Sequence, residues 1–146
     1  MRRSNEYLMT INIDPDQLRD LFSQDKLDAI FPKERSNQFF DALFGDADEG
    51  AYDIRLTFNS VEAKRLRFDL ELHQRPGRCL ACNLTYGLPT VFERHPVINI
   101  AGVVEQIGHL MNGQGNCSGW QLERSREITR RLHVVPLLID IEPPGM

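Results

Sequence analysis

The sequence predicts a single α+β domain over residues 1–146, with an antiparallel sheet of about five strands and helices packed on one face. Two observations predict this fold. From Tyr52 to Gly87, apolar and polar residues alternate in three successive runs, as in strands with one buried face. In the flanking segments, apolar residues recur every three or four positions, as in helices that bury one side. We therefore expect a three-stranded meander, joined by C-terminal strands and covered by helices on its apolar face.

The N-terminal third is predicted to be helical. Residues 1–13 are expected to form either a flexible arm or an edge strand. Asp14-Pro15 opens the first helix, because Asp caps helices well and Pro suits the first helical position. A second short helix ends at Pro32. A third covers Lys33 to Phe44, with Gly45 as its stop.

The meander is predicted to have strands at 52–58, 66–72 and 80–86. Asn59-Ser60 with Val61-Glu62 indicates the first turn. The second turn is Arg75-Pro76-Gly77-Arg78, where Pro presets φ and Gly supplies the positive φ of a type II turn. Such short connections join antiparallel neighbours.

The C-terminal part is predicted to contain one helix and further strands. Asn99 caps the clearest helix in the chain. Residues 120–124 are assigned to a strand, whereas 125–131 fit either a helix or a strand. The last strand runs from Leu132 to Ile141 and is apolar at both alternating positions, which predicts burial on both faces. Pro136 conflicts with a central strand, because it has no N–H for the ladder.

Composition restricts the classes of partner. The chain is 41% hydrophobic and 26% charged, with a net charge of −4, which suits one domain with a core. The first 50 residues carry 6 Lys and Arg against 11 Asp and Glu, and this balance disfavours nucleic acid as a partner. No apolar run is long enough to span a bilayer, and the start does not resemble a signal peptide. We expect a cytoplasmic protein that does not bind membranes.

The three cysteines are the thiol candidates. Cys79 and Cys82 have the C-x-x-C spacing of zinc knuckles and thiol redox sites, and Cys117 with one histidine would complete a tetrahedral zinc set. In a regular strand, however, Cys79 and Cys82 point to opposite faces, and no second paired motif is present. We therefore expect free thiols and no cofactor, with zinc as the alternative.

The polar face of the meander supplies the binding candidates. They are Arg55, Arg67, Asp69, Glu71, His73 and Asn83. Mixed charges across neighbouring strands are also typical of a solvated antiparallel sheet, which is the more frequent explanation. If the face binds, its mixed charge favours a protein or a polar small molecule over DNA.

Four stretches of the chain resemble a known family. They are residues 39–47 (FFDALFGDA), 51–56 (AYDIRL), 72–77 (LHQRPG) and 79–89 (CLACNLTYGLP). They are similar to a small family of uncharacterised bacterial proteins, some of which carry the label "pancreas/duodenum homeobox protein 1". A homeodomain needs a basic recognition helix, and the stretch around Trp120 does not match one. The resemblance therefore implies no activity, cofactor or site.

The chain contains no phosphate loop, nucleophile elbow or zinc-protease motif. We therefore predict a non-catalytic protein- or ligand-binding or adaptor domain, homodimeric, with a protein partner or self-association. The alternative is a small metal- or thiol-dependent enzyme using Cys79, Cys82 and Cys117.

Overall fold

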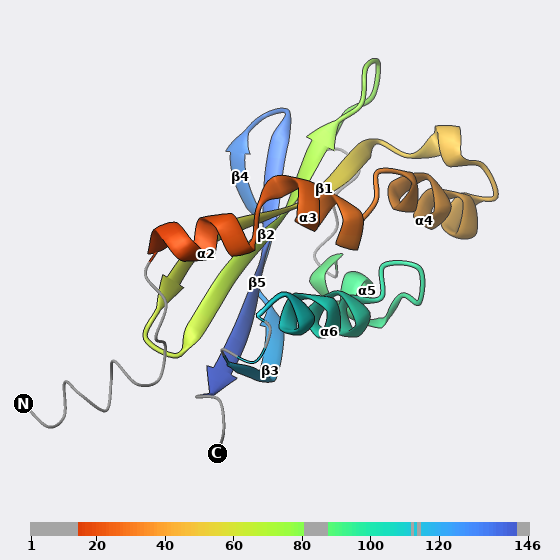
Figure 1. Cartoon of the computed structure of the whole chain (residues 1–146). Helices are drawn as coiled ribbons and strands as arrows, with labels where there is room; N and C mark the ends of the chain where they lie inside the picture. The colour runs from red at the N-terminus through yellow and green to blue at the C-terminus, as the bar shows by residue number, and fades with distance from the viewer. Residues whose placement is uncertain (1–14, 81–87, 112, 114, 143–146) are drawn as a thin grey trace, which may run out of the picture.

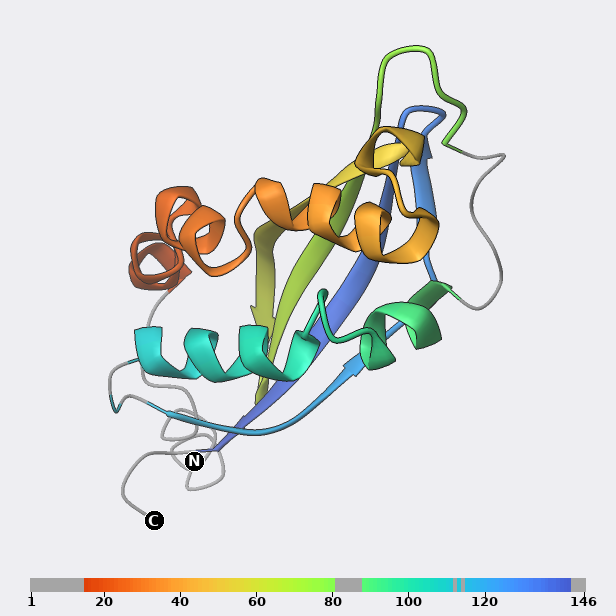
Figure 2. The ribbon, with the colours of Figure 1, turned by 90° about the vertical axis from the view of Figure 1, so that its right-hand side faces the viewer.

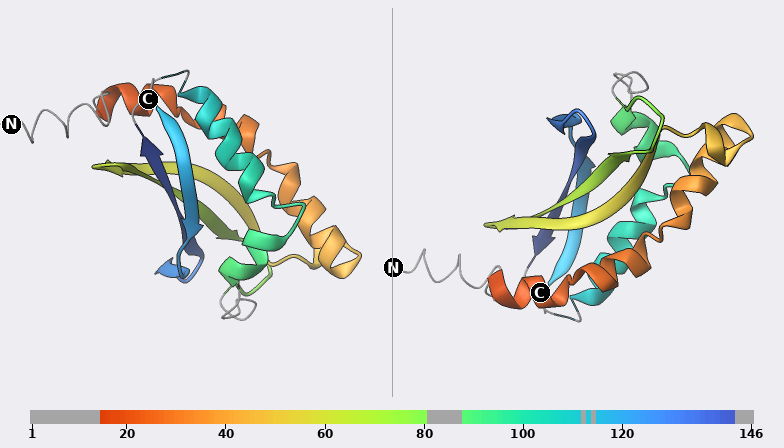
Figure 3. Two further views of the ribbon diagram at one scale, coloured as in Figure 1. Left: turned by 90° about the horizontal axis from the view of Figure 1, so that it is seen from below. Right: turned by 90° about the horizontal axis from the view of Figure 1, so that it is seen from above.

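The computed structural model describes residues 15–80, 88–111, 113 and 115–142 (Figure 1). The elements in chain order are α2 (Pro15–Leu21), α3 (Gln24–Ile30), α4 (Glu34–Phe44), the 3-10 turn η1 (Ala47–Glu49), β1 (Tyr52–Glu62), β2 (Arg65–Gln74), α5 (Leu88–Arg94), α6 (Ile100–Leu110), β3 (Asn116–Leu122), β4 (Arg126–Thr129) and β5 (Leu132–Glu142). The strands form a five-stranded antiparallel sheet. The helices lie together on one face of that sheet (Figures 2 and 3). The predicted α+β class is confirmed.

The sheet consists of two long hairpins placed edge to edge. The strand order is β1-β2-β5-β3, and β4 also pairs with β5. The first turn was predicted too early, because β1 continues through Glu62 and the chain turns at Ala63, which has φ 47°. The strand pairing shifts by one residue between Phe58 and Ser60, which lets the stretch 59–62, predicted as a turn, continue the strand.

The third strand of the predicted meander lies outside the described residues, apart from Leu80, which belongs to a turn. The place beside β2 that this strand would take is occupied by β5. In that pairing, Leu66, Phe68 and Leu70 lie opposite Ile139, Leu137 and Val135, so the two strands share one apolar face. The preceding turn is as predicted, with Gly77 at φ 74° and the Arg78 N–H donating to the Arg75 carbonyl at 3.1 Å.

Strand β5 is central and buried on both faces, as its sequence predicts. Pro136 fits there because the partner strand is interrupted opposite it: β3 ends at Leu122 and β4 begins at Arg126. The Pro136 carbonyl accepts from the Glu123 N–H at 2.9 Å. In an antiparallel strand, the N–H and C=O of one residue point to the same side. The side on which Pro136 lacks an N–H is therefore the side of this break, so the ladder loses no hydrogen bond there.

The core lies between the sheet and the helices. Phe68 is fully buried and contacts the rings of Phe22 and Phe58, whose centroids are 5.1 and 5.3 Å away. At the other end, Phe39 of α4 packs edge-on against Phe92 of α5. The Phe22–Phe68 pair connects the helix layer to the sheet, whereas Phe39–Phe92 joins two helices, and such aromatic pairs contribute beyond their buried area.

The edge of β1 is closed by side chains from the helices. The Ile54 N–H donates to Ser36 Oγ of α4 at 2.8 Å, and Ser36 is completely buried. Gln24 Nε2 of α3 donates to the Leu56 carbonyl at 2.8 Å. Edge strands normally expose such groups to other strands. Here side chains of α3 and α4 form hydrogen bonds to these backbone groups of β1. The bonds hold both helices against the sheet edge, next to the candidate site described below.

Tyr52, at the start of β1, gives the fold a testable pH dependence. The side chain is 3% exposed and packs edge-on against Phe40, and burial raises the pKa of its phenol. The stability from this neutral phenol is complete below about pH 10, where the unfolded tyrosine ionises, and is lost as pH rises towards the folded pKa. We expect the free energy of unfolding to fall by about 1.4 kcal/mol per pH unit above pH 10.

Urea unfolding of the wild type and Tyr52→Phe at pH 9, 10 and 11 checks this expectation. The difference between the two proteins isolates Tyr52 from the other groups that titrate in this range. Parallel declines in both proteins would show that the phenol is not the cause.

Candidate functional site

The six predicted binding residues do not form one site. Arg55 and His73 line a pocket at the edge of β1. Glu71 stands beside it and places Oε1 2.9 Å from His73 Nε2. Asn83 lies outside the described residues. The pocket therefore contains two of the predicted residues directly and a third as their partner.

Arg67 and Asp69 are removed from this pocket and are satisfied by their neighbours. Arg67 Nη2 lies 3.2 Å from Asp69 Oδ1, and Asn59 Nδ2 donates to Asp69 Oδ2 at 2.9 Å. Asp69 is only 7% exposed. Burying a carboxylate to this extent is costly unless it has such hydrogen-bond partners. The pair accordingly has a structural explanation and is not part of the candidate site.

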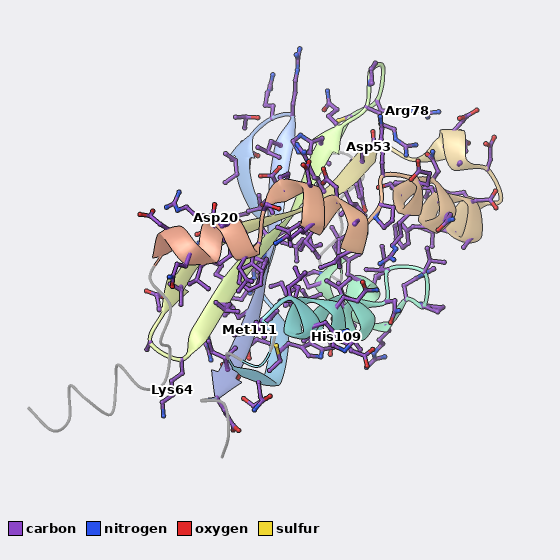
Figure 4. All side chains as sticks on the ribbon, viewed as in Figure 1. Asp20, Asp53, Lys64, Arg78, His109 and Met111 are labelled. Atoms are coloured by element: carbon purple, nitrogen blue, oxygen red, sulfur yellow. The ribbon has the colours of Figure 1, made fainter. Side chains whose placement is uncertain are left out.

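The pocket has a volume of about 440 Å³ and lies where α3 and the α3–α4 link meet β1. Phe31 and Ile54 contribute its apolar part and are 2% and 3% exposed. The charged lining comes from both sides: Asp28 and Lys33 from the helices, and Asp53, Arg55 and His73 from the sheet. Asp53 is labelled in Figure 4 and marks the strand side. Small-molecule sites commonly combine an apolar lining with a few polar groups.

Asp28 and Arg55 are locked to each other across the pocket. Arg55 Nη2 lies 3.1 Å from Asp28 Oδ2, and Arg55 Nε donates to Oδ1 at 3.3 Å. These hydrogen bonds hold the pKa of Asp28 below its ordinary value; slight burial opposes the shift, and a hydrogen bond from Gln24 adds to it. The same contact raises the pKa of Arg55. Both groups therefore stay ionised and oriented at neutral pH.

The second carboxylate, Asp53, is held from behind the pocket. Arg75 places Nη2 2.9 Å and Nε 3.1 Å from Asp53 Oδ1. The Arg75 side chain is only 14% exposed, whereas that of Asp53 is 46% exposed. Asp53 consequently faces the pocket as one half of a neutral pair.

Lys33 is the lining cation that lacks such a partner. It directly precedes α4 and is exposed. Its ammonium makes no ion pair or hydrogen bond with any residue in the described ranges. His73 is bonded through Nε2, which leaves its Nδ1 for a ligand. The lining thus offers the Lys33 ammonium and His73 Nδ1 to a ligand, beside two ion pairs in fixed positions.

Sequence reasoning missed most of this lining. Asp28, Phe31 and Lys33 are 20 or more positions from the nearest strand residue of the pocket. These residues reach the pocket only because α3 and α4 dock on the β1 edge. Sequence periodicity shows which residues share a face of one helix or strand, but not how two elements dock. Asp53, by contrast, alternates with Arg55 on the polar face, so the pattern that selected Arg55 also covers it.

The expectation of three free thiols is wrong at Cys79, which is disulfide-bonded. Cys79 lies after the Arg75–Arg78 turn and outside any strand, so the alternation on which the prediction rested does not apply there. Cys82 lies outside the described residues. Cys117 is a free, half-buried thiol in β3. Within the described ranges, no three His, Cys, Asp or Glu side chains are grouped to hold a metal.

Cys117 lines a second hollow between α6 and β3, of about 760 Å³, together with Glu105 and His109. Figure 4 labels His109 on α6. Burial raises the pKa of the Cys117 thiol, which lowers the fraction of thiolate, the reactive form. The geometry therefore does not activate this cysteine as a nucleophile.

We expect iodoacetamide at pH 8 to alkylate Cys117 at least several-fold more slowly in the folded protein than in urea, because the folded state disfavours the thiolate. Mass spectrometry of quenched time points measures both rates without reductant, and Cys117→Ser is the blank. Equal or faster labelling of the folded protein would instead indicate an activated thiol.

No helix in the described part of the chain is long and apolar enough to cross a membrane. Comparison with known protein families, curated proteins and solved structures gave no match. The fold and the pocket together define an α+β protein with a mixed-charge pocket at the closed edge of its sheet.

Proposed function

We propose that this protein is a non-catalytic binding domain and that the pocket at the β1 edge takes a polar ligand. The observation that carries the proposal is the arrangement of its lining. Two carboxylates held in ion pairs, His73, and Lys33, which has no ion pair among the described residues, stand around the nearly buried Phe31 and Ile54. Fixed ion pairs supply oriented polar groups at little cost of reorganisation on binding.

Binding is favoured over catalysis by the chemistry of the same residues. None of the seven lining residues is a Ser, Thr, Cys or Tyr, the side chains that most often act as nucleophiles or hydroxyl acids. Asp28 has a lowered pKa, so it is a weak general base. His73 is oriented by Glu71, and the seven lining residues include no hydroxyl or thiol for it to activate.

A pocket ligand also fits better than an apolar docking surface. The large apolar side chains exposed in the described part of the chain are spread over α4, α5 and β4 (Leu43, Phe44, Val91 and Ile128). Isolated exposed residues of this kind are normal on folded proteins. We therefore place the proposed binding in the pocket.

A screen of small polar molecules against the ¹⁵N-labelled protein tests the proposal. Amino acids, organic acids, sugars, nucleosides and polyamines form the set. Binding compounds are expected to shift the backbone amides of Lys33, Asp53–Arg55 and His73. Shifts confined to Glu105–Gly108, beside the second hollow, or no shifts with any compound, would contradict the proposed site.

A blocking variant sharpens this test. His73→Trp adds a large side chain at the pocket, and its half-exposed strand position tolerates an aromatic residue. Arg65→Trp is the matched control, because Arg65 lies on the same strand, is similarly exposed and is not part of the lining. We expect at least a tenfold loss of affinity in the first variant and less than twofold in the control.

A further inference from the structure

We propose that two copies of this chain associate through the outer edge of β3 and form an antiparallel strand pair there. This edge is at the other end of the sheet from the pocket, because β1 and β3 are the outer strands of the order β1-β2-β5-β3. β3 pairs with β5 on one side and with no other strand of the described part of the chain. Viewed from below, β3 lies at the near side of the sheet with α6 beside it (Figure 3, left). An unpaired strand edge of this kind is a template for another strand.

The first step is to identify the backbone groups that this edge presents. The Glu123 N–H donates to the Pro136 carbonyl of β5 at 2.9 Å, so the backbone of Glu123 faces β5. The direction of the backbone groups alternates along an antiparallel strand, and the pairing is regular over residues 119–122. The N–H and C=O of Trp120 and Leu122 therefore point away from β5. Within the described ranges, no hydrogen bond occupies these outward groups.

The second step is a comparison with the other outer strands of the sheet. The edge of β1 is closed by hydrogen bonds from Ser36 and Gln24. β4 contains an Arg and a Glu, and charged side chains discourage pairing at a strand edge. Residues 116–122 of β3 include no Lys, Arg, Asp or Glu. β3 is thus the outer strand whose edge has neither form of protection.

The third step is the charge at the two ends of β3, which favours a second copy as the partner. Arg124 follows the C-terminal end of β3 and is exposed. Glu105 of α6 lines the hollow beside the N-terminal end, together with Asn116 and Cys117. Neither charged side chain forms an ion pair within the described ranges. Two identical antiparallel strands place the C-terminal end of each beside the N-terminal end of the other. Arg124 of each copy is thereby brought to Glu105 of the other.

Neighbouring charges do not cancel this complementarity. Glu123, next to Arg124, is already paired with Arg126 at 3.5 Å. Glu105 is the one Asp, Glu, Lys or Arg among the residues that line the hollow. Because a two-fold interface contains every contact twice, each copy supplies one Arg124 and one Glu105. An unrelated strand could also pair with β3, but this chain itself supplies the complementary charge.

The hollow between α6 and β3 has room for the end of the second strand. Its volume is about 760 Å³, and Gly102, Gly108 and Gly115 contribute no side chains to fill it. An arginine that enters it finds the Glu105 carboxylate, and Arg–carboxylate hydrogen bonds are among the stronger ones in proteins. The hollow therefore suits the Arg124 end of the partner strand.

Sedimentation equilibrium over a hundredfold range of protein concentration tests the association, and we expect a monomer–dimer equilibrium. Hydrogen exchange followed by NMR locates the interface. The Trp120 and Leu122 amides are expected to be protected in the dimer and to exchange at least tenfold faster as it dissociates, whereas the Gln121 amide, which faces β5, stays protected. A monomer at every concentration, or a dimer in which Trp120 and Leu122 exchange much faster than Gln121, would overturn the proposal.

Charge reversal tests the antiparallel arrangement. Arg124→Glu and Glu105→Arg are each expected to raise the dimer dissociation constant at least tenfold, because each places like charges together. The double variant restores opposite charges and should recover most of the loss. Arg19→Glu on α2 is the matched control, since Arg19 is exposed and forms no ion pair within the described ranges, and we expect less than a twofold change. Losses in the single variants without recovery in the double variant would show that these residues do not meet.

Discussion

Replacing Phe68 with alanine is expected to lower the free energy of unfolding by about 3–5 kcal/mol. Phe68 is fully buried in the middle of β2, and its ring contacts Phe22 and Phe58. The substitution removes apolar contact and leaves a cavity between the helix layer and the sheet. That cavity cannot collapse easily, because the backbone of β2 is paired with β1 on one side and β5 on the other.

Urea unfolding followed by circular dichroism measures the effect. Phe44→Ala is the control, since Phe44 is 55% exposed, and we expect a change of less than about 1 kcal/mol there. Phe68→Leu keeps much of the volume and gives a measurable intermediate if the alanine variant does not fold. Similar losses for Phe44→Ala and Phe68→Ala would contradict the placement of the core.

The elements that the sequence predicts well are those whose burial is periodic. Strands β1 and β2 alternate because only one face packs on the helices, and α6 repeats every three or four residues for the same reason. The residues that cap and end helices are equally well predicted. Asn99 Oδ1 accepts from the Gly102 N–H at 3.2 Å as a helix cap, and Gly45 ends α4 at φ 79°.

The sequence does not predict in this way which strands lie next to each other in the sheet. Alternation in β2 specifies a buried face, but it does not specify which apolar strand lies alongside. β5 is separated from β2 by more than 50 residues and still takes the place predicted for 80–86. Its apolar residues occur at both alternating positions, so its sequence suits a central strand beside any partner.

The candidate site shows the same limit. Arg55 and His73 were accessible to sequence reasoning because they alternate on the polar face of the sheet. Lys33 was not, because only the docking of α3 and α4 on the β1 edge brings it to the pocket. Long-range contacts of this kind have no periodic signature in the chain.

Arg75→Met is expected to destabilise the protein by about 2–4 kcal/mol, because the Arg75 guanidinium joins three segments. It donates to Asp53 Oδ1, to Asn37 Oδ1 at 2.7 Å, and to the carbonyls of Ala47 and Gly50 at 2.8 and 3.4 Å. Hydrogen bonds to charged groups contribute roughly 1.5–3 kcal/mol each, and their sum is reduced here because the partners are partly exposed. Methionine keeps much of the apolar stem but supplies none of these donors.

Arg78→Met is the matched control, since Arg78 lies in the same turn, is 41% exposed and donates to the Asp48 carbonyl. We expect it to cost less than 1 kcal/mol in urea unfolding. Arg75→Lys should fall between the two, because an ammonium keeps the charge without the planar fork. Equal costs for the two methionine variants would show that the Arg75 contacts contribute little.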